Sequence, residues 1–291
     1  MITTLSLILV LVSAVIHPVW NILLKRSAHK VVFYLHIHLV FTVLFSFLLF
    51  VFPVTKISSA GWVFIMLSAL SHFLYQVFLC RTYELGDISL TYPVVRSSPI
   101  FVALLGFIFL KELPSPLAMA GIILIITGTQ VLNLDRFTLR GLFKPLRREN
   151  RRPMIAALFT ALFSAVYSAV DKKGVLEINP VLFFYLFFAI SGLMFAGYVF
   201  YLGQSGRKII RVFLDNKFAI TIASILEFSS YVLILYAFRL SKVAYVVALR
   251  QISVVFAALF GTVLLKEKNF NLRLAGSLIL FTGAFLITVC G

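Results

Sequence analysis

The chain has 291 residues, of which 62% are hydrophobic and only 12% are charged, and it carries a formal net charge of +16. Since a soluble domain carries about 25% charged residues, this composition excludes a soluble globular fold. Most of the chain must therefore lie in lipid, and its apolar runs of roughly 20 residues match the hydrocarbon core of a bilayer.

Apolar runs bounded by charged residues, proline or glycine predict an all-α integral membrane protein of ten transmembrane helices. The first five helices are expected at about 3–24, 32–53, 61–81, 90–110 and 115–134. The second five are expected at about 154–172, 180–202, 217–238, 243–265 and 271–290. The longest polar stretch, at 135–152, separates the two sets and is the predicted linker.

The two sets of helices correspond as repeats. From His72 to Gly128 the match holds without a gap at an offset of 155 residues (276 minus 121). The identities at this offset are Ala103 with Ala258, Gly106 with Gly261, Lys111-Glu112 with Lys266-Glu267, Ala120-Gly121 with Ala275-Gly276, and Thr127-Gly128 with Thr282-Gly283. Apolar composition alone does not align glycines and a Lys-Glu pair. We therefore predict a first repeat at 1–134, a basic linker at 135–152 and a second repeat at 153–291.

Five crossings in each repeat have a topological consequence. Because five is odd, the second repeat enters the membrane from the opposite side to the first, and the two repeats form an inverted pair. This architecture occurs mostly in transporters, where exchange of the conformations of the two halves turns a cavity open to one side into one open to the other. The prediction is two inverted five-helix repeats around a central cavity.

Several motifs recur in the same order in both halves. They are His17-Pro18-Val19-Trp20-Asn21 with Lys25, Tyr92-Pro93 with Arg96 and Pro99, Leu110-Lys111-Glu112, Tyr167-Ser168 with Asp171-Lys172, Arg250-Gln251 with Ser253, and Gly261 through Leu265-Lys266-Glu267. With these motifs, nearly the whole chain resembles the drug/metabolite transporter superfamily, specifically proteins with two EamA-type repeats. The resemblance implies a ten-helix basket with a central substrate cavity, but it does not identify the substrate. Of the motif residues, Gln251 is expected to contact substrate beside Arg250.

The distribution of basic residues gives one prediction of orientation and the resemblance gives another. Lysine and arginine gather in the loops at 25–30, 135–152, 207–217 and 266–273, on the linker's side of the membrane. The positive-inside rule then places the linker in the cytoplasm and both termini outside. Members of the resembled family are expected with both termini cytoplasmic, so the two arguments conflict. In either orientation the protein is expected to be a multi-pass protein of the plasma membrane, namely the bacterial inner membrane.

The remaining composition excludes other classes of protein. The basic residues form no recognition helix and no strand interleaved with aromatic residues, so no nucleic-acid partner is expected. Cys80 and Cys290 both lie in apolar surroundings and support neither a disulfide framework nor a metal site. His36 and His38 are two apart on a predicted helix and point to different faces, which makes them poor co-ligands for a metal. The first helix follows Met1 without a basic signal region and is expected to be retained.

Ionisable residues inside predicted helices are the main candidates for function, because a charged side chain in a bilayer needs a wet cavity or a partner. Arg96 and Arg250 lie in the fourth and ninth predicted helices. Two guanidinium groups at a cavity favour an anionic substrate group, since their geometry matches carboxylate or phosphate. The alternative is a snorkelling arginine or an internal ion pair.

His72 and Glu227 occupy equivalent positions in the two repeats, and both fall near the middle of a predicted helix. Buried groups of these types can exchange protons near neutral pH, so they are the candidates for proton coupling. The alternative is a structural hydrogen bond across the bundle.

A polar group in the first helix and four tyrosines complete the candidate site. His17 and Asn21 are four residues apart and share a helix face with Trp20, and Pro18 opens the helix nearby. The alternative is a kink with a satisfied histidine. The tyrosines expected deep enough to line a cavity are Tyr75, Tyr92, Tyr167 and Tyr231.

Two further groups of residues have a structural interpretation. Asp171 and Lys172 near the end of the sixth predicted helix favour an interfacial ion pair over a site. The repeated glycines are expected to permit close helix packing; they are Gly106, Gly121, Gly128, Gly261, Gly276 and Gly283.

The function predicted from these features is secondary transport of a small, anionic or amphipathic metabolite such as an amino acid or related compound, by alternating access between the repeats. An exporter or exchanger is the expected mode. The alternative is translocation of an amphiphilic or lipid-linked precursor, which an open lateral portal would distinguish. No P-loop, nucleophile with a base, or metal motif is present in the sequence, so neither an enzyme nor a cofactor is expected. The expected partners are the lipid bilayer and a small-molecule substrate, with a monomer as the plausible unit.

Overall fold

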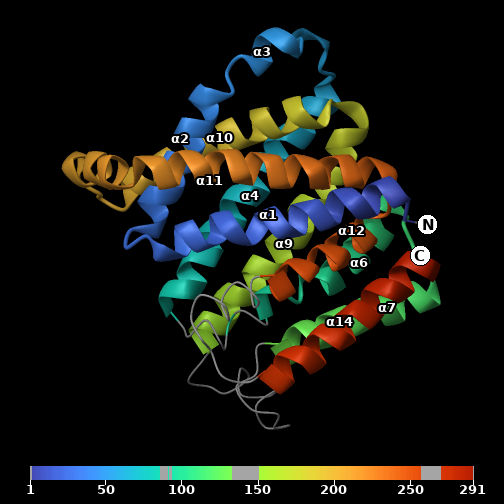
Figure 1. Cartoon of the computed structure of the whole chain (residues 1–291). Helices are drawn as coiled ribbons and strands as arrows, with labels where there is room; N and C mark the ends of the chain where they lie inside the picture. Colours follow the sequence, from blue (N-terminus) through green and yellow to red (C-terminus); the bar gives the residue numbers. More distant parts are fainter. Residues whose placement is uncertain (1, 86–90, 92–93, 133–150, 257–269, 291) are drawn as a thin grey trace.

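The computed structural model describes residues 2–85, 91, 94–132, 151–256 and 270–290. Every regular element within these ranges is a helix (Figure 1). In chain order the helices are α1 (Thr4–Arg26), α2 (Lys30–Leu44), α3 (Leu48–Val51), a 3₁₀ turn (Val54–Lys56), α4 (Ser59–Leu85), α6 (Ser98–Leu110), α7 (Pro116–Leu132), α9 (Arg151–Glu177), α10 (Pro180–Tyr201), α11 (Gly206–Leu240), α12 (Val243–Arg250) and α14 (Phe270–Cys290).

The helices are of the length and composition that a membrane protein requires. Five are long and apolar enough to cross a bilayer: Thr4–Leu24, Ser59–Leu85, Arg151–Glu177, Pro180–Tyr201 and Gly206–Leu240. Five shorter apolar helices accompany them, at Lys30–Leu44, Ser98–Leu110, Pro116–Leu132, Val243–Phe256 and Leu274–Val289. The prediction of an all-α membrane protein with two five-helix repeats is confirmed.

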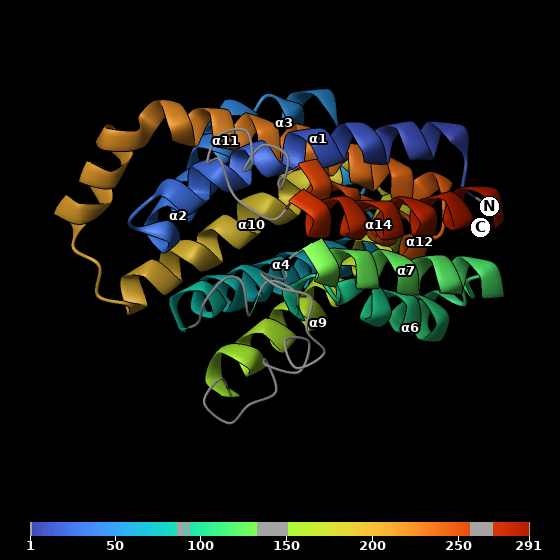
Figure 2. The ribbon, with the colours of Figure 1, turned by 60° about the horizontal axis from the view of Figure 1, so that its bottom comes forward.

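Helices from the two halves pack against each other in symmetric pairs (Figures 1 and 2). Helix α1 lies along α11, and α4 lies along α9. At the offset of 155 residues α4 corresponds to α11, and α1 and α9 correspond as the first helices of their halves, so exchanging the halves converts one pair into the other. This is the arrangement expected of two repeats related by a two-fold axis.

The last helix of each half shows the same symmetry at atomic detail. A Cβ atom on Gly121 would lie 2.7 Å from the carbonyl oxygen of Gly283, and one on Gly128 would lie 2.7 Å from that of Gly276. From Gly121 to Gly128 along α7, the contacted residue on α14 moves back from Gly283 to Gly276. The two helices are therefore antiparallel, as inverted repeats require. The prediction that these four glycines permit close packing is confirmed, and Figure 2 shows the two helices side by side.

Several helix boundaries differ from the predicted ones. The helix expected at 32–53 stops at Leu44, where the Ser46 hydroxyl donates to the Val43 carbonyl oxygen at 2.9 Å and the chain turns before α3. The helix expected at 217–238 is longer, since α11 spans Gly206–Leu240 and extends beyond the rest of the molecule (Figure 2). Its N-terminal turns carry basic residues, so the search for apolar runs left them out of the predicted helix.

The fourth and ninth predicted helices are interrupted at corresponding places. In the first half a turn at Arg96 and Ser97 precedes α6, and Pro99 removes one helical N–H donor there. In the second half Gln251 is a single turn residue with helical backbone angles (φ −63°, ψ −16°), and helical residues follow it to Phe256, the last residue that the structure describes before 270. Arg96 corresponds to Gln251 at the repeat offset, so the regular helical pattern is interrupted at equivalent places in the two halves.

We expect Gly128→Ala to destabilise the protein by about 1–3 kcal/mol, the usual cost of overpacking. The added Cβ would lie 2.6 Å from the backbone nitrogen of Leu280, and neither helix backbone can move aside cheaply. The matched control is Gly197→Ala in α10, where the added Cβ meets no atom within 4 Å. Thermal unfolding in detergent micelles measures both variants, and equal melting temperatures would contradict the packing argument.

Candidate functional site

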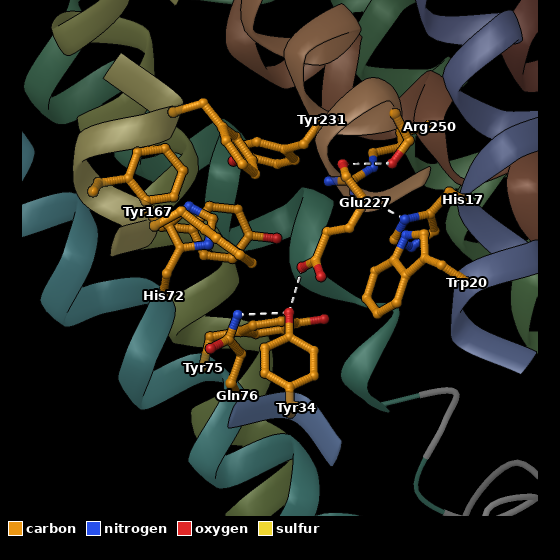
Figure 3. A pocket seen from close by; sticks show the side chains of 14 residues that line it. His17, Trp20, Tyr34, His72, Tyr75, Gln76, Tyr167, Glu227, Tyr231 and Arg250 are labelled. Carbon is orange, nitrogen blue, oxygen red and sulfur yellow. Dashed lines mark hydrogen bonds between the residues drawn. The ribbon is translucent and has the colours of Figure 1, made fainter. Parts of the chain in front are cut away.

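A cavity lies between the two halves near the middle of the bundle (Figure 3). Its lining comes from α1, α2 and α4 of the first half and from α9, α10, α11 and α12 of the second. The lining residues are His17, Trp20, Tyr34, His72, Tyr75, Gln76, Tyr167, Phe184, Phe187, Phe188, Glu227, Ser230, Tyr231 and Arg250. Its volume for water-sized molecules is about 30 Å³, enough for about two waters.

One wall of the cavity holds the carboxyl group of Glu227. The hydroxyl of Tyr34 donates to Glu227 Oε1, and the same hydroxyl accepts a hydrogen bond of 2.7 Å from Gln76 Nε2 (Figure 3). These contacts join α11 of the second half to α2 and α4 of the first. Glu227 is therefore held by one oxygen, and its second oxygen is left for the cavity.

Arg250 and His17 meet on the other side of the cavity. Arg250 Nη2 donates to His17 Nδ1 at 3.2 Å, and the guanidinium lies 5.2 Å from the centre of the Tyr231 ring (Figure 3). His17 Nε2 lies 3.2 Å from the amide nitrogen of Asn21, one turn later on α1. The Trp20 ring meets the His17 ring edge to face, with centroids 5.2 Å apart. The first-helix motif and Arg250 thus form one polar unit.

Asp171 is the most deeply buried acid beside the cavity, with no exposed surface. It accepts hydrogen bonds from Ser68 Oγ at 2.6 Å, from His72 Nε2 at 3.0 Å and from the Tyr231 hydroxyl. Lys172 points elsewhere and pairs with Glu112 at 3.4 Å. The prediction of an interfacial ion pair at Asp171 and Lys172 is therefore wrong for Asp171, which positions two cavity-lining rings.

His72 is clamped between aromatic rings as well as bonded to Asp171. Its ring stacks on Tyr167, with centroids 4.0 Å apart, and on Phe187, with centroids 4.5 Å apart. The Tyr231 ring meets it edge-on at 5.3 Å. Only a small rotation of the imidazole is compatible with these contacts, so His72 presents a fixed edge to the cavity.

Four polar atoms of the cavity lining have no hydrogen-bond partner among the residues that the structure describes. Two are donors, Trp20 Nε1 and Arg250 Nε, and two are acceptors, Gln76 Oε1 and Glu227 Oε2. A buried polar group without a partner costs about 1–3 kcal/mol. The cavity therefore suits a ligand that offers acceptors to one pair and donors to the other.

The structure brings eight of the twelve predicted site residues to the cavity lining: His17, Trp20, His72, Tyr75, Tyr167, Glu227, Tyr231 and Arg250. Asn21 is linked to the lining through His17. Gln251 is buried and Arg96 is half-buried, and neither lines the cavity. Tyr92 lies outside the described residues.

Sequence reasoning missed Tyr34, Gln76, Ser230 and three phenylalanines of α10 in the lining. Gln76 lies four residues after His72 and Ser230 three after Glu227, so the helical period placed both on candidate faces. Tyr34 carried no such signal, because α2 contains no candidate site residue and its buried face follows only from packing against α10 and α11. Within the described residues no group of three or more metal-ligating side chains occurs.

We expect Asp171→Ala to lower the melting temperature strongly, because three buried donors lose their acceptor. Each donor left without a partner costs about 1–3 kcal/mol. Asp171→Asn should cost less, since its amide oxygen still accepts from His72 and Tyr231 while the Ser68 hydroxyl turns to accept. Thermal unfolding in detergent checks the order. The control is Asp215→Ala, whose pair with Arg211 is exposed. An Asn variant as unstable as the Ala variant would show that charge, not bonding, is required.

Comparisons with known proteins agree with this geometry. A model of the EamA-like transporter family matches residues 4–134 and 151–289. One solved structure, titled only as the crystal structure of a protein, superposes with a TM-score of 0.74 over 98% of this chain and 97% of that chain, at 14% sequence identity. At that identity the likeness concerns the fold alone. No curated protein sequence matches the chain.

Proposed function

This chain belongs to the EamA-like transporter family and is a multi-pass membrane transporter, and we propose that its substrate is a small zwitterionic metabolite such as an amino acid. The observation that carries the proposal is the mixed character of the four unpartnered polar atoms in the cavity. Arg250 and Trp20 offer donors to a carboxylate, and Glu227 and Gln76 offer acceptors to an ammonium group. The phenylalanines of α10 provide apolar surface for the rest of the molecule.

The size of the cavity supports transport by alternating access. A ligand site for a small molecule usually measures about 300–1,000 Å³, whereas about 30 Å³ is available here to water-sized molecules. A metabolite therefore enters only when the two halves move apart. The inverted repeats supply two such openings by symmetry, one toward each side of the membrane.

The predicted site residues outside the lining have a role in this proposal. Arg96 and Gln251 lie at the interruptions of their helices, and separation of the halves would bring them toward the substrate. Asn21 donates to the backbone carbonyl oxygen of His17 at 2.9 Å, and the His17 ring accepts from Arg250. Tyr92 is retained as a proposed contact from sequence. Glu227 and His72 are the proposed proton-exchanging groups, Glu227 through the oxygen that faces the cavity.

Uptake into proteoliposomes of phenylalanine, 3-phenylpropionate and phenethylamine tests the proposed substrate class, since these share a ring and a two-carbon chain and differ only in the charged groups on it. Phenylalanine should move fastest. Arg250→Ala should slow it by at least about tenfold, the effect of losing about 1.4 kcal/mol. Arg211→Ala is the control, because Arg211 is exposed on α11. Equal transport by wild type and Arg250→Ala would remove Arg250 from the site.

Glu227→Gln tests the coupling. The substitution keeps the size of the side chain and an oxygen for Tyr34, but it removes the exchangeable proton. We expect an imposed pH gradient to stimulate uptake of phenylalanine by the wild type and to have no effect on the variant, while exchange without a gradient continues in both. A variant that still responds to the gradient would assign coupling to another group, with His72→Gln as the next substitution. Movement of a fluorescent phospholipid in the same vesicles would instead favour a lipid translocase.

A further inference from the structure

We propose that Glu112 and Lys172 form a latch that holds the cavity shut toward the edge of the molecule where α1 begins and α14 ends. This inference rests on the proposed alternating access, because it names the contact that must break for the cavity to open on that side. The latch consists of Glu112 and Lys172 together with the backbone groups that they bind. Glu112 belongs to the first half and Lys172 to the second.

Lys172 is the centre of the latch. Its ammonium group lies 3.4 Å from Glu112 Oε1, and it donates to the carbonyl oxygens of Phe238 and Ser241, the latter at 3.1 Å. The Lys172 side chain is only 9% exposed, so solvent screens these interactions weakly. A lysine at the C-terminal carbonyls of α11 also complements the helix dipole.

Glu112 completes the contact from the other half. Besides pairing with Lys172, it accepts a hydrogen bond of 2.7 Å from the backbone N–H of Val243, the first residue of α12. A carboxylate at a helix N-terminus is favoured by the exposed N–H groups and the helix dipole. Glu112 and Lys172 thus pair with each other. Lys172 also binds the C-terminal end of α11, and Glu112 binds the N-terminal end of α12, on either side of the turn between these helices.

The loop that carries Glu112 is fixed to the same turn by two neighbouring contacts. Lys242 Nζ donates to the carbonyl oxygen of Leu113 at 2.8 Å, and the N–H of Ser115 donates to the hydroxyl of Tyr245 at 3.2 Å. Both contacts join the first half to the second. The interaction is therefore a band of polar contacts, with the ion pair at its buried end.

The backbone before Glu112 is built to point it inward. Lys111 ends α6 in the left-handed conformation with φ 55°, and the N–H of Glu112 then bonds to the Gly106 carbonyl oxygen at 3.0 Å. A left-handed residue other than glycine costs about 1–2 kcal/mol. Strain of this kind persists where the surrounding contacts require it, and here it directs the carboxylate to Lys172 and Val243.

The latch lies directly beyond the cavity. Phe238 follows Tyr231 by seven residues on α11, and Arg250 follows Val243 by seven residues on α12, which places the latch about 10 Å along both helices from the Tyr231–Arg250 pair. On α9, Lys172 directly follows Asp171, which binds His72 and Tyr231. Helices α9, α11 and α12 therefore cannot move away from the first half at this end while the latch holds.

Distance measurement between spin labels tests the latch without any substrate. Leu113 and Leu240 are exposed on opposite halves beside the latch, and cysteines placed there in a Cys80→Ser, Cys290→Ser background carry the labels in lipid nanodiscs. We expect Glu112→Gln and Lys172→Met each to add a longer-distance component that the labelled parent lacks. Lys173→Met, at the exposed neighbour on α9, is the matched control and should leave the distribution unchanged.

Glu112→Gln keeps the bond to Val243 and removes only the charge, so it remains informative if Lys172→Met fails to fold. The double variant should shift the distribution no further than the larger single effect, because both residues act in one contact. Unchanged distances in Glu112→Gln and in the double variant would overturn the latch. If the distances stay unchanged while phenylalanine is taken up normally, the latch alone is refuted. If the distances shift while none of the three compounds is taken up, the latch stands and the proposed substrate class is refuted.

Discussion

A charged or strongly polar side chain inside a bilayer has to be compensated within the protein, and this constraint organises the molecule. Asp171 meets it with three donors from two other helices. Glu227 and Arg250 meet it only in part, since one atom of each lacks a partner within the described structure. The first arrangement builds a rigid wall. The second leaves capacity for a ligand, so one physical requirement separates the supporting residues from the proposed binding residues.

The scaffold is symmetric, while the chemistry placed on it is not. The helix pairs and the glycine contacts repeat across the two halves. By contrast, Glu227 corresponds to His72, and Arg250 corresponds to the apolar Val95. In the proposed alternating access, this symmetry supplies two equivalent openings, one formed when each half takes the conformation of the other. Because the polar groups differ between the halves, the two sides of the cavity offer different hydrogen-bonding groups. A transporter needs such a difference if it is to bind a substrate in one orientation.

The latch and the cavity depend on the same three helices of the second half. Helix α9 carries Asp171 toward the cavity and Lys172 toward Glu112, on consecutive residues. A change in the position of α9 therefore acts on both places together. In the proposed mechanism, filling of the cavity and release of the proposed latch are linked through this helix, which would couple substrate binding to opening at one side.

The amino-acid sequence by itself determined the membrane class, the repeats, their inverted relation and the glycine contacts, because lipid imposes apolar runs of fixed length and close helix contacts impose small residues. It also placed Arg250, Glu227, His72 and the His17 motif in helices, where their cost in lipid marks them. Only the tertiary structure decided which of these side chains meet. Tyr34, Gln76 and the burial of Asp171 depend on how α2, α4 and α9 pack across the two halves, and hydrogen bonds between residues 42 to 193 positions apart leave no local pattern in the chain.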